Sequence, residues 1–156
     1  MPGNKMKKSI VAVCLIYFAL VAPTSAEELA SYAFIQDDGT LRISGETVHL
    51  WGLYIPPTET ACHEFQRPMN CGKRAKLALE FKIGVEFVHC EKKVRYADNT
   101  LGAVCHARGE DLGAYLLQKG WAMALPEAPF PYHAAEKIAR SRGVGVWGLS
   151  GRIKGR

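Results

Sequence analysis

The sequence has no long hydrophobic run of the kind that crosses a membrane. Its longest apolar stretch is Ile10–Ala22, which is shorter than the roughly 20 residues that a spanning helix needs. We therefore expect no transmembrane segment in the chain that follows this apolar stretch.

Acidic residues are absent from the first 26 positions, where Lys5, Lys7 and Lys8 precede the apolar run. Small residues follow it at Thr24–Ala26, and a positive start, an apolar middle and small residues at the cleavage point are typical of a secretory signal peptide. We predict that residues 1–26 are such a peptide, cleaved near Ala26, and that the protein is periplasmic or secreted. The alternative is an uncleaved anchor, which the short apolar run disfavours.

An excess of charge of one sign is also missing once this segment is set aside. The chain has 20 basic and 15 acidic residues and a net charge of +5, but Lys5, Lys7 and Lys8 are three of the basic ones, which leaves 17 against 15. This near balance disfavours a protein that coats polyanions through charge. The length predicts one domain, which we place at residues 27–150, with a basic tail at 151–156.

Cysteine is sparse, and Cys14 belongs to the predicted signal peptide, which leaves Cys62, Cys71, Cys90 and Cys105. An even number in an exported protein favours disulfides, although the count alone leaves three pairings open. The alternative is a zinc site, but the Cys residues adjoin His residues without the spacing that offers two ligands from one loop.

Position along the chain favours one pairing of these cysteines. Cys90 and Cys105 fall on neighbouring predicted strands, and Cys62 and Cys71 bracket a proline-containing segment. We predict Cys62–Cys71 and Cys90–Cys105, with no metal site and no cofactor.

The residue pattern predicts three short strands, a helix, two more strands and two final helices. Alternation and turn signals give the strands, and helical spacing gives the helices. The strands are Ser31–Ile35, Thr40–Ile43, Val48–Leu53, Val85–Cys90 and Gly102–Ala107; the helices span Cys71–Phe81, run from Leu112 to Lys119 and begin near Pro131.

This element order, together with local motifs, resembles the staphylococcal-nuclease-like, or thermonuclease, family. The similar segments are Asp38–Ile43 (DGTLRI), Val48–Pro56 (VHLWGLYIP), Cys71–Ala75, Gly109–Leu112, Gly120–Ala122, Tyr132–Arg140 and Gly143–Trp147. They extend over about Ala30 to Gly148. The resemblance implies an α+β, mainly β fold, a five-stranded OB barrel with about three helices, whose strand face often binds oligonucleotides or oligosaccharides.

The resemblance also implies where a nuclease site would lie, and this sequence departs from the family there. Active members cut phosphodiesters with calcium held by aspartates, a glutamate that activates water and two arginines. The five matching positions are occupied by Gly39, His49, Tyr54, Pro57 and Thr100. None is a carboxylate or an arginine, so we predict a degenerate site without catalytic residues.

Neighbouring residues offer only a weak substitute for that site. Asp37, Asp38 and Glu59 lie close to the lost positions, but calcium needs six to eight converging oxygens, and aspartates before a glycine are typical of turns. His49 offers a partial phosphate contact, although a histidine on an alternating strand is more often a surface side chain.

Three functions follow from this reading. The first is a non-catalytic, exported binding or accessory protein of the bacterial envelope that uses the former nuclease face, with Trp51, Tyr54 and Tyr96 as aromatic candidates. Degenerate exported members of the family resemble accessory proteins of surface-polysaccharide production, which points to a glycan partner; an oligonucleotide is the other ligand class. The second is a residual calcium-dependent phosphodiesterase that uses Asp37, Asp38, His49 and Glu59. The third is a structural protein that binds another envelope protein.

Overall fold

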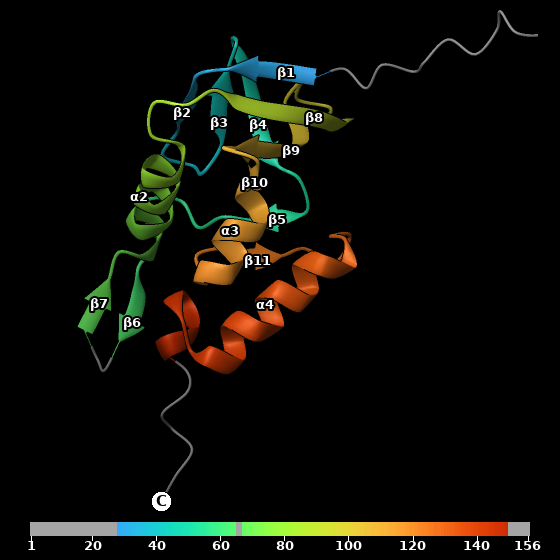
Figure 1. Cartoon of the computed structure of the whole chain (residues 1–156). Coiled ribbons are helices and arrows are strands. Elements are labelled where there is room, and N and C mark those ends of the chain that lie inside the picture. The colour runs from blue at the N-terminus through green and yellow to red at the C-terminus, as the bar shows by residue number, and fades with distance from the viewer. Residues whose placement is uncertain (1–27, 65–66, 150–156) are drawn as a thin grey trace, which may run out of the picture.

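The computed structural model describes residues 28–64 and 67–149. Figure 1 shows a strand-rich upper part, with one helix at its side and two helices below it. The predicted signal peptide and the basic tail lie outside the described residues. Within them, no helix has the length and apolar character needed to cross a bilayer.

The strands form a nearly closed barrel. Its sheet has the order β1-β8-β9-β4-β3-β2, with β10 (Glu110–Asp111) as an extra partner of β9. The bounds are β1 Glu28–Ser31, β2 Ala33–Ile35, β3 Leu41–Ile43, β4 Glu46–Leu50, β8 Val88–Arg95 and β9 Leu101–Ala107. Only Tyr32 separates β1 from β2, so one bent N-terminal segment pairs with both ends of the sheet. Counting that segment once gives five strands, and the expected OB-fold-like α+β class is confirmed.

The barrel interior follows from alternation along the strands. Leu41 and Ile43 of β3, and Val48 and Leu50 of β4, are almost completely buried, while the intervening Arg42 is exposed. Side chains two residues apart point to the same face of a strand. Burying each such side chain contributes about 1.5–3 kcal/mol, so these strands fix the register of the barrel.

Three α-helices occur among the described residues: α2 (Cys71–Ile83), α3 (Leu112–Lys119) and α4 (Phe130–Arg142). Helix α3 packs against β9, α2 and α4, so it joins the barrel to the lower helix. Glycine follows each helix at its C-terminal end, at Gly84, Gly120 and Gly143. A 3-10 helix, η1 (Gly145–Leu149), follows α4.

Both predicted disulfides are present. Cys90 and Cys105 are register partners on β8 and β9, with 4.0 Å between their Cα atoms, and both are buried in the barrel. Cys62 and Cys71 are 5.7 Å apart and connect β6 to the start of α2. Disulfides of this kind form in oxidising compartments, which places the protein outside the cytoplasm.

Three predicted strands differ from the observed ones by more than one residue, and the one predicted at Ser31–Ile35 is divided at Tyr32 into β1 and β2. The strand predicted at Val85–Cys90 is β8, which begins at Val88 and continues to Arg95 through its pairing with β9, although its second half is largely charged and exposed. The strand predicted at Val48–Leu53 is interrupted at Gly52, where φ is +76°. Glycine adopts this left-handed conformation at low cost, and a separate strand, β5 (Leu53–Tyr54), then pairs with β11 (Met123–Ala124).

A small hairpin was not predicted from the sequence. It consists of β6 (Cys62–Glu64) and β7 (Arg67–Met69), which pair in antiparallel fashion. Pro68 lies within β7, and proline usually argues against a strand because it cannot donate to the ladder. The predicted first helix also extends two residues further than expected, to Ile83.

Candidate functional site

An open groove of about 490 Å³ lies at the end of the barrel where β4 and β8 end and β9 begins. It is formed by β4, the turn before β5, the turn between β8 and β9, and one residue after β11. Its lining comprises His49, Leu50, Gly52, Leu53, Tyr96, Ala97, Asp98, Thr100 and Leu125. We call it the His49 groove.

Two rings form one wall of the groove. The His49 and Tyr96 rings are nearly perpendicular, with centroids 5.6 Å apart. His49 is the register partner of Gly102 on β9, and a Cβ atom on Gly102 would lie 2.8 Å from the Tyr96 hydroxyl. The absence of a side chain at Gly102 therefore lets the Tyr96 ring lie over β9 beside His49. Tyr96 remains 40% exposed, so its ring is accessible to a ligand.

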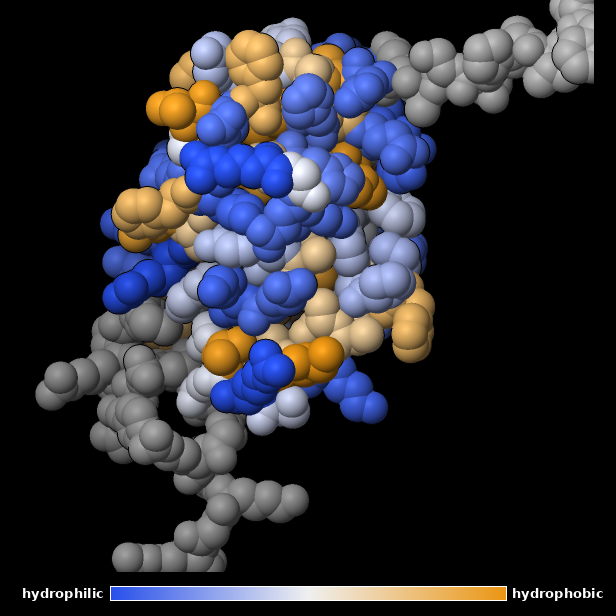
Figure 2. All heavy atoms as spheres, in the orientation of Figure 1, coloured by the Kyte–Doolittle hydropathy of each residue, from blue (hydrophilic) through white to orange (hydrophobic). Residues whose placement is uncertain are grey.

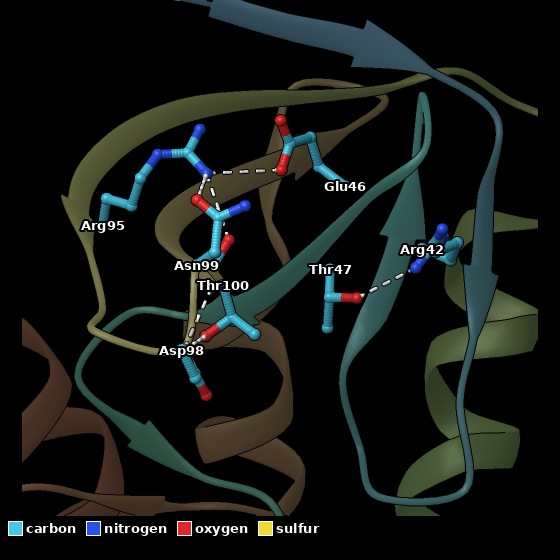
Figure 3. Close-up of polar contacts among 7 residues, drawn as sticks. All are labelled: Arg42, Glu46, Thr47, Arg95, Asp98, Asn99 and Thr100. Atoms are coloured by element: carbon cyan, nitrogen blue, oxygen red, sulfur yellow. Dashed lines mark hydrogen bonds and ion pairs between the residues drawn. The ribbon is translucent and has the colours of Figure 1, made fainter.

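The turn between β8 and β9 presents a carboxylate in a fixed position. The Thr100 backbone N–H and hydroxyl donate to Asp98 Oδ1 at 3.0 and 2.7 Å, as Figure 3 shows. These bonds, first the hydroxyl and then the backbone N–H, hold the pKa of Asp98 below its ordinary value, and His49 adds to the effect. Asp98 is therefore ionised at neutral pH.

Arg95 braces this turn from the side of β8. Its Nη1 atom donates to the Asn99 backbone oxygen and to Asn99 Oδ1 at 3.1 and 2.9 Å, and lies 3.5 Å from Glu46 Oε2. In Figure 3 these three side chains point toward one another between the ends of two hairpins. Asn99 has a positive φ of 66°, which asparagine tolerates better than most residues. The guanidinium group thus stabilises the turn.

A second turn of the same kind lies before β3. Thr40 donates its backbone N–H and hydroxyl to Asp38 Oδ1 at 2.9 and 2.7 Å. Desolvation raises the pKa of Asp38, but the two bonds from Thr40 and the charge of His49 outweigh it, and the net pKa is lowered. His49 therefore interacts with two ionised carboxylates, Asp38 and Asp98. A negatively charged ligand meets repulsion here.

The structure brings together only part of the site implied by the family resemblance. His49 and Thr100 line the same groove, whereas Tyr54 is exposed on β5. A Cβ on Gly39 would contact Ile55, and the Pro57 carbonyl lies against Gly72 at the start of α2. These last three are absent from the lining of the His49 groove.

The neighbouring carboxylates do not converge either. Asp37 forms an ion pair with Lys76 at 2.8 Å, Asp38 is bound by Thr40, and Glu59 is exposed in a turn. Within residues 28–64 and 67–149, no cluster of three or more His, Cys, Asp or Glu side chains is arranged to hold a metal ion.

Sequence reasoning missed Asp98 as a site residue, because it was assigned only to a loop. A signal was nevertheless present: Asp98-Asn99-Thr100 repeats the Asp-x-Thr pattern of Asp38-Gly39-Thr40. In both places the threonine donates to the aspartate, and His49 contributes to the lowered pKa of both aspartates. Of the three aromatic candidates, Tyr96 lines the groove, while Trp51 and Tyr54 do not.

Comparison with known proteins finds a distant relative. Over 150 residues the chain is 27% identical to the succinoglycan biosynthesis protein ExoI of Rhizobium meliloti (strain 1021); the match covers 93% of this chain and 78% of that protein. No family model matches the chain.

Proposed function

We propose that the protein is an exported, non-catalytic accessory protein of surface-polysaccharide production and that the His49 groove binds a glycan. The observation that carries the proposal is the pairing of an accessible aromatic ring, Tyr96, with a fixed carboxylate, Asp98, in one open groove.

Sugar rings need both kinds of contact. The C–H groups of a pyranose are slightly positive and are attracted to the negative face of an aromatic ring. Its hydroxyl groups donate to carboxylate oxygens, and bonds to a charged acceptor are the stronger ones. Asp98 lines the groove and accepts from Thr100 through Oδ1 alone, so Oδ2 accepts no hydrogen bond from the described residues.

The charges in the groove favour a neutral glycan over an oligonucleotide. A phosphate site requires cations, whereas Asp98 in the lining and Asp38 outside it are both ionised. Arg95, at the end of β8 beside the turn to β9, is bound to Asn99 and Glu46. Phosphate binding through this groove would require breaking those contacts.

The distant relative supports a role in surface-polysaccharide production, since ExoI is a succinoglycan biosynthesis protein. The family resemblance fits this proposal if the chain is a nuclease-like OB-fold protein that has lost its catalytic side chains and kept the binding face. Export after cleavage near Ala26 is part of the proposal. N-terminal sequencing of protein recovered outside the cytoplasm should then begin at Glu27.

Calorimetric titration tests the binding site. The protein is titrated with fragments of the host's own surface polysaccharide and, separately, with a single-stranded oligonucleotide. We expect the fragments to bind and Tyr96→Ala to weaken their binding about tenfold, which corresponds to about 1.4 kcal/mol. Asp98→Asn should weaken it as well, because the neutral amide is a poorer acceptor.

Phe130→Ala is the matched control, because Phe130 is an exposed aromatic residue of α4 that does not line the groove. Its binding should equal that of the unmodified protein. Tight binding of the oligonucleotide, or fragment binding that is insensitive to both groove variants, would contradict the proposal.

A further inference from the structure

A second groove, of about 460 Å³, lies at the other end of the β8–β9 hairpin. It includes Tyr32 from the link between β1 and β2, Glu86 and Phe87 from the loop before β8, His89 from β8, and Arg108 from the turn after β9. The His49 groove lies at the Tyr96 end of β8 and this groove at the Phe87 end, and their linings share no residue. We call it the Tyr32–Phe87 groove.

Two exposed rings line this groove. Tyr32 and Phe87 are in edge-to-face contact, with centroids 4.5 Å apart and an angle of 77° between the rings. They are 57% and 51% exposed, so they contribute little to the core. Figure 2 shows hydrophobic side chains gathered at the upper left of the molecule, over the loop that joins α2 to β8. Apolar side chains that gather on the surface outside the core are typical of a binding site.

Two basic side chains of this groove lie close to carboxylates. Arg108 Nε lies 3.5 Å from Glu86 Oε1, and His89 Nδ1 lies 3.4 Å from Glu28 Oε1. The Arg108 guanidinium lies over Gly84, where an added Cβ would be 3.2 Å from Nη2. The groove therefore offers hydrogen-bond donors and acceptors, and the charge of Arg108 is balanced by Glu86.

We infer that the Tyr32–Phe87 groove is a second carbohydrate-binding site that takes an uncharged pyranose of the same glycan chain. One ring of the aromatic pair supplies the stacking face, the Arg108 guanidinium donates to ring or hydroxyl oxygens, and Glu86 accepts from hydroxyl groups. The balance of charge at the rim favours a neutral, hydroxyl-rich ligand over a phosphate or a free carboxylate.

This inference rests on the proposed function and adds a consequence for chain length. Two sites at opposite ends of one hairpin are occupied together only by a glycan long enough to reach both. Binding at the second site then becomes intramolecular, and the overall affinity exceeds that of either site. A disaccharide occupies one site at a time, so its affinity is not raised by linkage to the second site.

The test compares a disaccharide fraction with a long fraction of the host's surface polysaccharide, using calorimetry and amide chemical-shift mapping on the full chain. We expect the long fraction to shift signals at both grooves. Phe87→Ala should weaken its binding about tenfold, equivalent to about 1.4 kcal/mol, and Arg108→Gln should weaken it in the same direction. Phe130→Ala should leave it unchanged.

The two proposals fail separately. If Tyr96→Ala weakens binding of the long fraction and neither Phe87→Ala nor Arg108→Gln does, the second site is overturned and the His49 groove stands. If Phe87→Ala and Arg108→Gln weaken binding and Tyr96→Ala does not, the second site is supported and the proposal for the His49 groove is wrong. If no fraction binds, or no variant alters binding, both are overturned. Melting temperatures close to that of the unmodified protein confirm that the surface variants are folded.

Discussion

The hydroxyl of Tyr132 donates to the carboxylate of Asp111, with distances of 2.9 Å to Oδ1 and 2.7 Å to Oδ2. The same carboxylate caps α3, since Oδ1 accepts from the backbone N–H groups of Gly113 and Ala114. One carboxylate therefore accepts hydrogen bonds from backbone N–H groups in the first turn of α3 and from Tyr132 of α4, and so connects the two helices.

Removing the Tyr132 hydroxyl should lower stability. Tyr132→Phe keeps the buried ring but leaves Asp111 without this donor, and the loss of a hydrogen bond to a charged group costs about 1.5–3 kcal/mol. Urea denaturation measures the change in the free energy of unfolding. Tyr54→Phe is the control, because Tyr54 is exposed on β5 and should change stability little. Equal effects of the two variants would show that the contact with Asp111 contributes nothing.

The same contact predicts a loss of stability at alkaline pH. Burial, followed by the hydrogen bond to Asp111 and the negative charge of that residue, raises the pKa of Tyr132 well above its ordinary value of 10.0. Above about pH 10 the unfolded chain releases this proton while the folded protein retains it, so stability is complete below that pH and falls as the pH rises further. Thermal unfolding between neutral pH and pH 11 should show a smaller alkaline loss for Tyr132→Phe. Parallel curves for the two proteins would contradict this.

The Cys90–Cys105 disulfide should contribute about 3 kcal/mol, the value that the chain-entropy model gives for a loop of its length. Its sequence separation is 15 residues, and both sulfurs belong to fully buried residues. A variant with both cysteines changed to alanine should unfold at a correspondingly lower urea concentration. The variant lacking Cys62 and Cys71 should lose less, since that bridge has a separation of 9 and Cys62 is only partly buried. The opposite ranking would contradict the prediction.

Thr100 should control the ionisation of Asp98. Thr100→Val removes the hydroxyl donor at 2.7 Å and keeps the backbone N–H, so the pKa of Asp98 should move up toward its ordinary value. Carboxyl NMR titration measures this shift. Thr40→Val should have the equivalent effect on Asp38 and leave Asp98 nearly unchanged. An unaltered titration of Asp98 in Thr100→Val would exclude this role of the hydroxyl.

We expect no calcium-dependent cleavage of DNA or RNA. A missing general base costs about 10²–10⁴ in rate and a missing charge donor about 10²–10³, and the positions that would supply them hold His49, Pro57 and Thr100. The assay uses single-stranded and duplex substrates with millimolar calcium or chelator. Cleavage that requires calcium and disappears in Asp38→Ala or Glu59→Ala would instead establish the phosphodiesterase alternative.

The helices and the buried strands were predictable because the local signals agree with tertiary packing. Gly84, Gly120 and Gly143 follow the helices, and Leu41, Ile43, Val48 and Leu50 alternate as barrel strands should. The second half of β8 was missed because Lys93, Val94 and Arg95 are all exposed, so no alternation marks it. Its strand structure depends on pairing with β9, which lies later in the chain.

The site was predictable only in part, because its residues come from segments far apart in the sequence. His49 and Thr100 were identified through the family resemblance, and the structure places both in one groove. Their grouping with Tyr96 depends on Gly102, whose missing side chain makes room for the ring. The Tyr32–Phe87 groove was not foreseen, because the contact between its rings depends on closure of the barrel.

The position of the β8–β9 hairpin also sets an order of assembly. The hairpin is local, and Cys90 and Cys105 face each other across it, whereas β1 docks on its outer edge at β8 and β4 on its other edge at β9. Local contacts form before distant ones because a shorter loop costs less entropy to close. We therefore expect the hairpin to act as the template and the N-terminal strand to join last. Until then the outer edge of β8 is unpaired, and an unpaired strand edge is a template for pairing with another chain.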